Sequence, residues 1–549
     1  MKHASLLDLP GWSLVALTAL CSLGVGAASL RHSGSLAFPI DDGYIYSNYV
    51  LAASQGHLFT YNIGETSGGI TGLAWYLLST LSYLLLAPFH GLLGGLAPPS
   101  VQADAALAMQ AGHLYLAAYI PGVLCLAAAA LGARRLADLT LPRSDRNLRT
   151  RDAFCWLLGA IAGADLGLVW GAMSGLEVAL SSALVAWSLC LLLAEAREGR
   201  LRWSLLLVGL LPWARPELLV VGVSGLLWLL LRALSVSRVG RRQPLANAGL
   251  YLGAMVGGLL AMSAIYFIGW GKPLPSSFYA KVGGLRFGSR FLSAVEELVI
   301  AGRYLPFVTA VLALLGGLSA WIGRKNHSND EDREARWSAL LLLLTFVLFI
   351  AAIMTSLPWF GQEDRYLLPI HPVAIVLVGL LVWFFLQRLS FDSLLSRKGF
   401  LPGLAAVVLL AGAGVNYWWA TRNYAVQVRN IADGHVQPAL WLAKNTPPDS
   451  LIASEPIGAV KLFSRRRTID LVGLTTPATL GTYGNWSLAW RALKDADADY
   501  LLFYPAWFGR EGIPQWAAER ARFAVPDNRI VGASVIAIYE LRWDLYADQ

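Results

Sequence analysis

The chain has 549 residues, of which 56% are hydrophobic and only 14% are charged. Soluble domains carry about 25% charged residues, so the composition excludes an ordinary soluble protein. The net charge of +8 lies mostly in short loops between apolar runs, which is typical of cytoplasmic membrane loops rather than of a nucleic-acid-binding surface.

Several apolar runs, such as "SALLLLLTFVLFIAAIM", approach the roughly 20 residues that cross a bilayer as a helix. They predict an α-helical polytopic membrane protein. The first run, from Trp12 to Leu30, is expected to be an uncleaved anchor, with a cleaved signal peptide as the alternative. The four cysteines lie in or beside apolar runs and predict no disulfide framework.

Loop charges predict the topology. The loop "RRLADLTLPRSDRNLRTR" has six arginines and two aspartates, and "RALSVSRVGRR" has four arginines, so both are expected in the cytoplasm. The loop at 31–70 then lies outside. This requires that 70–90 does not fully cross, and the Gly/Pro-rich "HGLLGGLAPPS" after it favours a juxtamembrane or re-entrant helix. A second, amphipathic juxtamembrane helix is expected at 43–55.

Eleven spanning helices are expected in all. Besides the first, they lie near 110–133, 153–170, 175–195, 203–214, 217–232, 246–270, 302–323, 337–356, 370–388 and 399–418. The two short ones flank "PWARPE" and are expected to penetrate only partly.

The C-terminal part changes character and alternates helices with strands. Strands are predicted at "SLIAS", "TIDLV", "DYLLFY" and "NRIVGASVIAIYEL". This pattern indicates a small α/β domain. The sequence therefore predicts a transmembrane module at 1–420 and an extracytoplasmic α/β domain at 421–549.

Two adjacent carboxylates, Asp41 and Asp42, follow the first apolar run. Such a pair can raise one pKa and provide a general base, or it can hold a divalent cation. The alternative is a helix cap for the segment "GYIYSNYVLAA".

Further charged residues lie at the ends of apolar runs or within them. Glu177 is expected at a helix start, where a negative charge is favourable in any case. Arg215 and Glu217 lie inside an apolar segment, where charges normally face a cavity or each other.

The outer loops also hold cations. Lys272 and Lys281 could bind phosphate as point charges, or extend to the membrane interface. The guanidinium of Arg365 suits phosphate, with a local salt bridge to Glu363 or Asp364 as the alternative. An acid pair and several cations on one side of a membrane would fit a substrate with a phosphate headgroup and a lipid tail.

In the same order along the chain, "PIDDGYIYSNYVLAASQGHLFTYNIGE", "SGLEVAL", "ARPE", "GKPLPSSFYAK" and "DRYLLPIHP" resemble recurring segments of the GT-C glycosyltransferases. Those polytopic enzymes use polyprenyl-phosphate sugars as donors. The tail "LIASEPIGAVKLFSRRRTIDLVGLTTP" resembles the outer domain of the branch that includes bacterial terminal arabinofuranosyltransferases. It departs from that pattern at Pro456, which follows Glu455. The resemblance covers most of the chain.

The resemblance makes Asp41 or Asp42 the catalytic carboxylate. Asp41 is the preferred general base, and Asp42 would then orient the acceptor or its partner. The resemblance places Lys281, Arg365, Arg215 and Lys272 at the donor phosphate. It assigns substrate binding to Glu177, Glu217, Tyr44, Tyr279 and Glu363, with fixing of the cations as the alternative for Glu177 and Glu217.

The implied function is inverting transfer of a sugar, best matched as arabinofuranose, to an envelope glycan, a lipid-linked glycan or a protein. The expected location is the bacterial inner membrane, with the active site on its outer face. No cofactor is required, although a divalent cation remains compatible with the acid pair. The alternatives are a mannosyl or other hexosyl transferase, a flippase of lipid-linked sugars, and an assembly scaffold.

Overall fold

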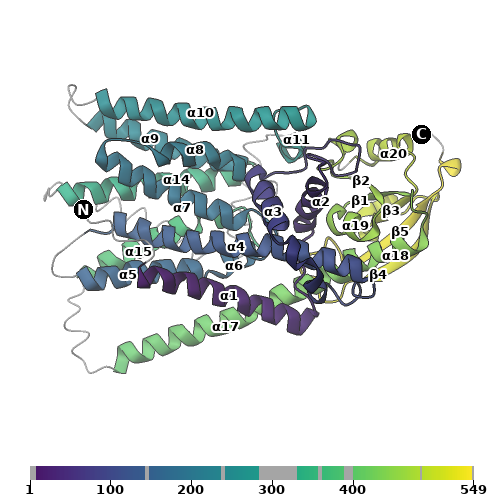
Figure 1. Ribbon diagram of the computed structural model, residues 1–549, viewed down its shortest axis with the longest axis horizontal. Helices are drawn as coiled ribbons and strands as arrows, with labels where there is room; N and C mark the ends of the chain where they lie inside the picture. Colours follow the sequence, from purple (N-terminus) through teal and green to yellow (C-terminus); the bar gives the residue numbers. More distant parts are fainter. Residues whose placement is uncertain are drawn as a thin grey trace.

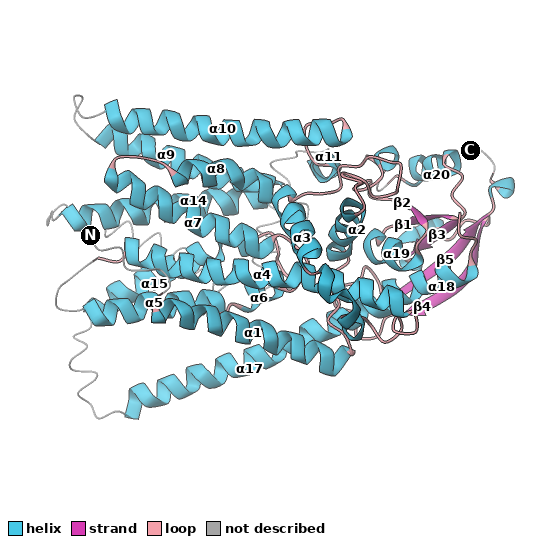
Figure 2. Cartoon of the chain, viewed as in Figure 1, coloured by secondary structure: helices cyan, strands magenta, loops and turns pink. Residues whose placement is uncertain are grey.

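A computed structural model describes residues 8–142, 148–235, 242–282, 330–356, 362–388, 400–482 and 485–546. The protein is an elongated bundle of helices with a smaller α/β domain at one end (Figure 1). All strands of the described residues lie in that C-terminal domain (Figure 2). The expected helical membrane protein with a C-terminal α/β domain is confirmed at this level.

Six helices of the described residues are long and apolar enough to cross a membrane, and a pair bent by 53° would make a seventh. The six are α1 (Leu9–Ser33), α4 (Ala105–Thr140), α7 (Val178–Glu198), α9 (Leu219–Ser235), α10 (Arg242–Trp270) and α14 (Asp330–Ser356). The bent pair is α5 (Leu148–Gly163) and α6 (Leu166–Ala172). The bundle also contains α8 (Trp203–Ala214), α15 (His371–Arg388) and α17 (Phe400–Ile431). The expected count of eleven is not confirmed, and the helix expected at 302–323 lies outside the described residues.

Local signals at the ends of the long apolar runs set the helix boundaries. Asp8 caps α1 by accepting the N–H of Gly11 at 2.8 Å. Asp104 caps α4 in the same way. These caps satisfy N–H groups that have no partner within the helix. Gly34 ends α1 with a φ of 74°, a left-handed conformation that glycine adopts without steric cost.

The segment 34–104 leaves the bundle and returns at the same end. The N–H of Leu36 donates to the carbonyl of Leu96, which joins the end of α1 to the approach to α4. Between them, α3 (Leu73–Leu85) has 13 residues, or about 20 Å of helix, too short for a hydrocarbon core of about 30 Å. The structure thus agrees with the expectation that 70–90 does not cross.

The helix expected at 43–55 is α2 (Asp42–Ser54), but it is not a surface amphipathic helix. Nine of its 13 residues are buried. It lies between the bundle and the C-terminal domain (Figure 1). Both sides are therefore covered by protein, so the expected amphipathic pattern was wrong, whereas the juxtamembrane position stays a prediction.

The C-terminal domain has a five-stranded mixed sheet in the order β2-β1-β3-β5-β4. The strands are β1 (Leu451–Ser454), β2 (Arg467–Asp470), β3 (Tyr500–Phe503), β4 (Ala517–Ala524) and β5 (Val535–Leu541). β1 pairs in parallel with β2 and β3, whereas β5 is antiparallel to β3 and β4. The helices are α18 (Gln437–Asn445), α19 (Ile457–Ser464) and α20 (Trp486–Asp495).

The sheet domain is held to the loop around α2 by side chains that bond to the start of α19. The amide of Asn48 donates to the carbonyl of Gly458 at 2.9 Å. The hydroxyl of Tyr61 donates to the carbonyl of Ile457 at 2.8 Å. The first outer loop and the C-terminal domain thus form one continuous buried region, since both contribute to the same hydrophobic core.

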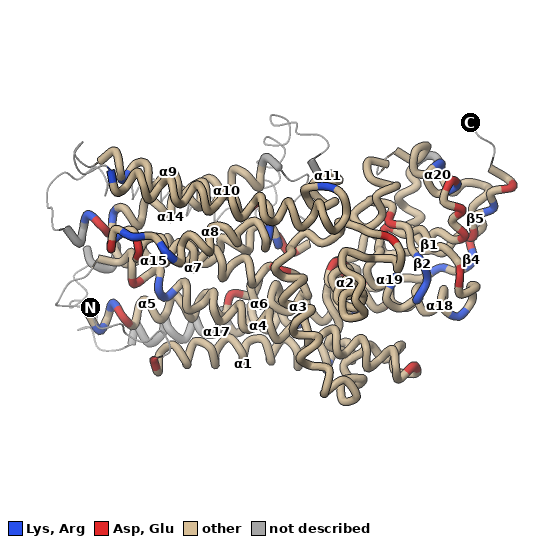
Figure 3. The backbone as a smooth tube through the Cα atoms, turned by 45° about the horizontal axis from the view of Figure 1, so that its top comes forward, with Lys and Arg blue, Asp and Glu red and all other residues tan. Residues whose placement is uncertain are grey.

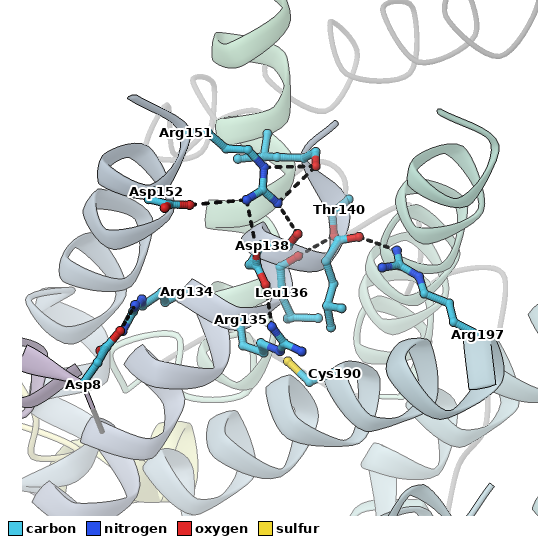
Figure 4. A network of polar contacts seen from close by, with 12 residues as sticks. Asp8, Arg134, Arg135, Leu136, Asp138, Thr140, Arg151, Asp152, Cys190 and Arg197 are labelled. Carbon is cyan, nitrogen blue, oxygen red and sulfur yellow. Dashed lines mark hydrogen bonds and ion pairs between the residues drawn. The ribbon is translucent and has the colours of Figure 1, made fainter. Parts of the chain in front are cut away.

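Charged residues of the bundle gather at its two ends (Figure 3). At the end far from the sheet domain, arginines tie neighbouring helices together (Figure 4). Arg134 makes two bonds of 2.8 Å to the carboxylate of Asp8, joining α4 to α1. Arg151 of α5 binds the carboxylate of Asp138 in α4 at 2.9 Å. Arg134 and Arg151 belong to the segment "RRLADLTLPRSDRNLRTR", which the sequence predicts to be a cytoplasmic loop.

Candidate active site

A cavity of about 490 Å³ lies where the bundle meets the C-terminal domain. Its described apolar lining includes Leu219, Val220, Leu259, Leu274, Phe278, Ala352 and Ile353. Its described charged lining residues are Asp42, Glu177, Arg215, Glu217 and Arg365. The C-terminal domain adds Leu474. A cavity that joins charged and apolar walls suits an amphiphilic ligand.

Asp42 and Arg365 form an ion pair at this cavity. Asp42 begins α2, and its Oδ2 lies 2.8 Å from Nη1 of Arg365. The aspartate side chain is 34% exposed and the arginine only 8%. Arg365 follows three residues in left-handed conformation, with φ between 52° and 64°. Such backbone persists where its surroundings hold it, and functional sites often contain it.

Glu363 supplies that hold. Its Oε1 accepts hydrogen bonds from Asn423 at 3.1 Å and from Gln427 at 2.6 Å, both on α17. The carboxylate therefore fixes the turn before α15 instead of lining the cavity. We expected Glu363 to bind substrate, and that role stays a prediction.

Arg215 lies at the break between α8 and α9. It has an extended backbone, with φ −155°, and Pro216 follows it, so the chain cannot continue as one helix. Its Nε is 2.6 Å from Oε1 of Glu217, and its Nη1 is 3.5 Å from Oε1 of Glu177. We expected these charges to face a cavity or each other. They do both, since Arg215 pairs with Glu217 and Glu177 and all three line the cavity.

The ring of Tyr366 joins the two buried arginines. The guanidinium carbons of Arg215 and Arg365 lie 4.7 Å and 5.2 Å from its centroid. Cations attract the negative face of an aromatic ring, so one ring holds two positive groups at the cavity.

Among the residues that the structure describes, Oε2 of Glu177 and Nε of Arg365 are buried at this cavity without a hydrogen-bond partner. A buried group of this kind costs about 1–3 kcal/mol, and charged groups cost more. A bound ligand with a donor and an acceptor at the right positions would satisfy both.

Asp41 points away from its neighbour Asp42. Its Oδ2 accepts the N–H of Gly458 at 2.7 Å, and its Oδ1 accepts the N–H of Ala459 at 3.0 Å. Both donors belong to the N-terminus of α19, where the helix dipole favours a negative charge. The alternative role of Asp41 was a cap for α2, but its side chain does not cap that helix. It accepts hydrogen bonds at the start of α19 in the C-terminal domain instead.

His435 completes the surroundings of Asp41. Its Nδ1 lies 3.0 Å from Oδ1 of Asp41, and its Nε2 lies 3.1 Å from the hydroxyl of Tyr504. A carboxylate can only accept, so Nδ1–H of His435 donates to Asp41. Sequence analysis did not identify His435 or Tyr504, because each is far from Asp41 along the chain.

The other predicted residues fall into three places. Tyr44 is fully buried, and its hydroxyl lies 3.3 Å from that of Tyr115. Lys272 lies over Trp270 and Tyr279, at 5.4 Å and 5.2 Å, and neither it nor Tyr279 lines the cavity. Lys281 lies in α11 (Ser276–Val282), but its side chain is outside the described part of the chain.

Tyr46 is a lining residue that sequence analysis missed. Its hydroxyl accepts the N–H of Gly72 at 2.7 Å, and it lies beside Glu177. No group of three or more His, Cys, Asp or Glu side chains in the described ranges is placed to hold a metal ion. Since Asp41 and Asp42 bind different partners, they do not form a shared pair of metal ligands.

The C-terminal domain matches a sequence family described as a domain of unknown function (DUF8728), over residues 422–544. The amino-acid sequence matches no curated protein.

Solved structures resemble the whole chain. The structure of an oligosaccharyltransferase from Archaeoglobus fulgidus, in complex with zinc and sulfate, has a TM-score of 0.53 at 10% identity, over 89% of this chain and 67% of that one. ArnT from Cupriavidus metallidurans, in the apo state, has a TM-score of 0.52 at 14% identity, over 98% and 99% of the two chains. These likenesses confirm the GT-C fold that the sequence motifs predicted.

Proposed function

We propose that the protein is a glycosyltransferase that moves a sugar from a polyprenyl-phosphate donor to an acceptor. The proposed site lies on the outer face of the bacterial cytoplasmic membrane. The observation that carries the proposal is the partly exposed Asp42, paired with Arg365 in a cavity that has charged and apolar walls. The GT-C fold supports it, because a solved structure with that fold is an oligosaccharyltransferase.

In the proposed reaction, an acceptor hydroxyl oxygen attacks the anomeric carbon of the donor sugar. The bond from that carbon to the phosphate oxygen breaks, and polyprenyl phosphate leaves with the electron pair. The hydroxyl proton passes to the carboxylate of Asp42. A single displacement of this kind inverts the anomeric configuration.

Asp42, rather than Asp41, is the proposed base. A general base has to reach the hydroxyl proton within hydrogen-bond distance. Asp42 lines the cavity, whereas both oxygens of Asp41 accept hydrogen bonds from the C-terminal domain. The resemblance favoured Asp41 as the base, and this proposal gives that role to Asp42.

Cations are assigned to the leaving phosphate. Arg365 and Arg215 line the cavity, and Lys281 lies on α11, whose Ser277 and Phe278 also line it. Positive groups placed at a developing negative charge stabilise the transition state. The apolar lining residues of α9, α10 and α14 would contact the lipid chain of the donor.

The proposal for the sugar rests on the sequence motifs. Arabinofuranose fits the branch that the tail "LIASEPIGAVKLFSRRRTIDLVGLTTP" resembles, and mannose or another hexose is the alternative. The acceptor is an envelope polysaccharide, a lipid-linked glycan or a protein.

The test uses the full-length protein in liposomes with synthetic polyprenyl-phosphate sugars, starting with arabinofuranose and mannose. We expect release of polyprenyl phosphate from one donor, and a loss of about 100-fold or more in Asp42→Asn. The matched control is Asp527→Asn, an exposed aspartate of the C-terminal domain. Donor binding without release, unchanged in Asp42→Asn, would overturn the proposal and indicate a lipid-linked-sugar transporter.

A further inference from the structure

The C-terminal domain contains a second pocket, of about 380 Å³, which is separate from the cavity around Asp42. That volume lies within the range of small-molecule pockets, about 300–1,000 Å³. Its described lining residues are Leu471, Thr482, Asn485, Trp486, Ala489, Phe503 and Trp507. None of these side chains carries a charge, and the polar ones are a hydroxyl and an amide.

Trp486 lines the pocket, whereas the two rings that stack on it do not. Its ring is stacked on Trp490 at 4.8 Å and on Phe508 at 5.4 Å. Phe503, which also lines the pocket, lies edge-on to Trp486 at 4.9 Å. Trp486 therefore belongs to an aromatic cluster and presents part of its ring to the pocket.

The second indole of the pocket is held rigidly. Trp507 packs on Tyr504 at 4.7 Å. A Cβ added to Gly532 would lie 2.6 Å from the Trp507 ring, so this glycine allows the backbone to approach it closely. A fixed aromatic surface loses little conformational freedom when a ligand binds.

The pocket lies close to the cavity along the chain. Leu471 lines the pocket and Leu474 lines the cavity, on the same loop after β2. Three residues of chain span at most about 11 Å. An oligomer a few units long could therefore extend from one site to the other.

We infer that this aromatic pocket binds a sugar ring of a neutral glycan. The ring's C–H face would pack on the indoles of Trp486 and Trp507 that line the pocket, and its hydroxyls would bond to Asn485 and Thr482. The uncharged lining selects against acidic sugars, because a buried unpaired charge is costly. That the glycan is the acceptor rests on the proposed function, whereas binding itself does not.

The first test uses calorimetry to measure glycan binding by the full-length protein in detergent. The ligands are neutral hexasaccharides of arabinofuranose, mannose and galactose. We expect saturable binding of one of them, weakened about tenfold or more in Trp486→Ala. Trp486→Phe should retain part of the affinity, because it keeps an aromatic face. The matched control is Trp543→Ala, since Trp543 stacks on Trp516 in the same domain outside the pocket lining. Failure of every hexasaccharide to bind, or equal affinity in Trp486→Ala, overturns the inference.

Turnover separates this inference from the proposed function. With a long acceptor, Trp486→Ala should raise KM and leave kcat unchanged, while transfer to a disaccharide stays normal. Binding that persists although the wild type releases no polyprenyl phosphate would refute the proposed function and leave the glycan site standing. Normal turnover without glycan binding would refute the site alone.

Discussion

Two groups of buried arginines, at opposite ends of the bundle, differ in how completely they are paired. Arg151, at the end far from the sheet domain, is 3% exposed and bonds to the carboxylate of Asp138 and to the carbonyls of Asp138 and Leu141 (Figure 4). Arg365, at the cavity, is 8% exposed and keeps its Nε without a partner.

The difference between Arg151 and Arg365 matters because Arg365 borders open volume. Nη1 of Arg232 and Oε2 of Glu334, at the far end, also lack a hydrogen-bond partner among the described residues, but neither lines the cavity. Arg151 ties the start of α5 to the end of α4. At the cavity, Glu177 and Arg365 each retain an unpaired buried atom beside open volume. Proteins rarely bury unpaired polar atoms without a reason, and a ligand site is one such reason.

The largest expected effect is that of Arg365→Gln on turnover. Removing one positioned donor from a transition state typically costs about 100-fold to 1,000-fold in kcat. We expect a loss of that size for release of polyprenyl phosphate, with a normal gel-filtration profile. Arg522→Gln, an exposed arginine on β4, is the control and should remain active. Full activity of Arg365→Gln would mean that the cavity pair is structural, and the comparison would fail.

Arg151→Met should show the opposite behaviour. The variant removes hydrogen bonds of a buried arginine to Asp138 and Leu141, at a cost of about 1–3 kcal/mol, while Arg135 still pairs with Asp138. We expect a lower thermal midpoint in detergent and unchanged turnover per folded molecule. Arg200→Met, a control near the same end of the bundle, has no ion pair within the described part of the chain and should unfold like the wild type. A selective loss of turnover in Arg151→Met would assign function to the network as well.

The same comparison can be made within the aspartate pair. Asp41→Asn removes the charge from three hydrogen bonds to the C-terminal domain, so we expect a destabilisation of about 1–3 kcal/mol. The thermal midpoint and the rate of proteolysis near 421 would measure it. Turnover should fall less than in Asp42→Asn. An equal or greater fall at an unchanged midpoint would return the role of base to Asp41.

Most of the fold was predictable, because burial in a membrane and in a sheet leaves periodic or continuous apolar runs. β4 (Ala517–Ala524) was missed, since "AAERARFA" has charges at exposed positions. It is an edge strand, and edge strands carry such charges because they protect against pairing with another chain. The strand predicted at "NRIVGASVIAIYEL" begins only at Val535.

The site was predictable only in part. Asp42, Glu177, Arg215, Glu217 and Arg365 were identified because charges in an apolar chain are costly, and the structure brings them to one cavity. The orientation of Asp41 was not predictable, since its partner Gly458 is 417 residues away. Gly458 itself is the signal that was overlooked. A Cβ there would lie 2.3 Å from the Asp41 carbonyl, so the close approach requires glycine.

A pH-dependent effect concerns Glu455, which lies near Asp41 and Asp42 in the C-terminal domain. Burial, and then the nearby charges of Asp41, Asp470 and Asp42, raise the pKa of this carboxyl to about 8. Below the ordinary value of 4.5 both the folded and the unfolded chain hold the proton. Between 4.5 and about 8 only the folded chain does, so the contribution of Glu455 to stability is lost as pH rises through this window.

Glu455→Gln removes that titration while keeping the shape of the side chain. The thermal midpoint of the variant should therefore rise relative to the wild type from about pH 4.5 to about pH 8, and then level off. Glu519→Gln is the control with the reverse sign, because its hydrogen bond to Arg522 lowers the pKa of Glu519. Its midpoint should fall slightly relative to the wild type above the ordinary carboxyl pKa. A difference that stays constant with pH would show that Glu455 is ionised in the folded protein, and that the region around Glu455 is open to water.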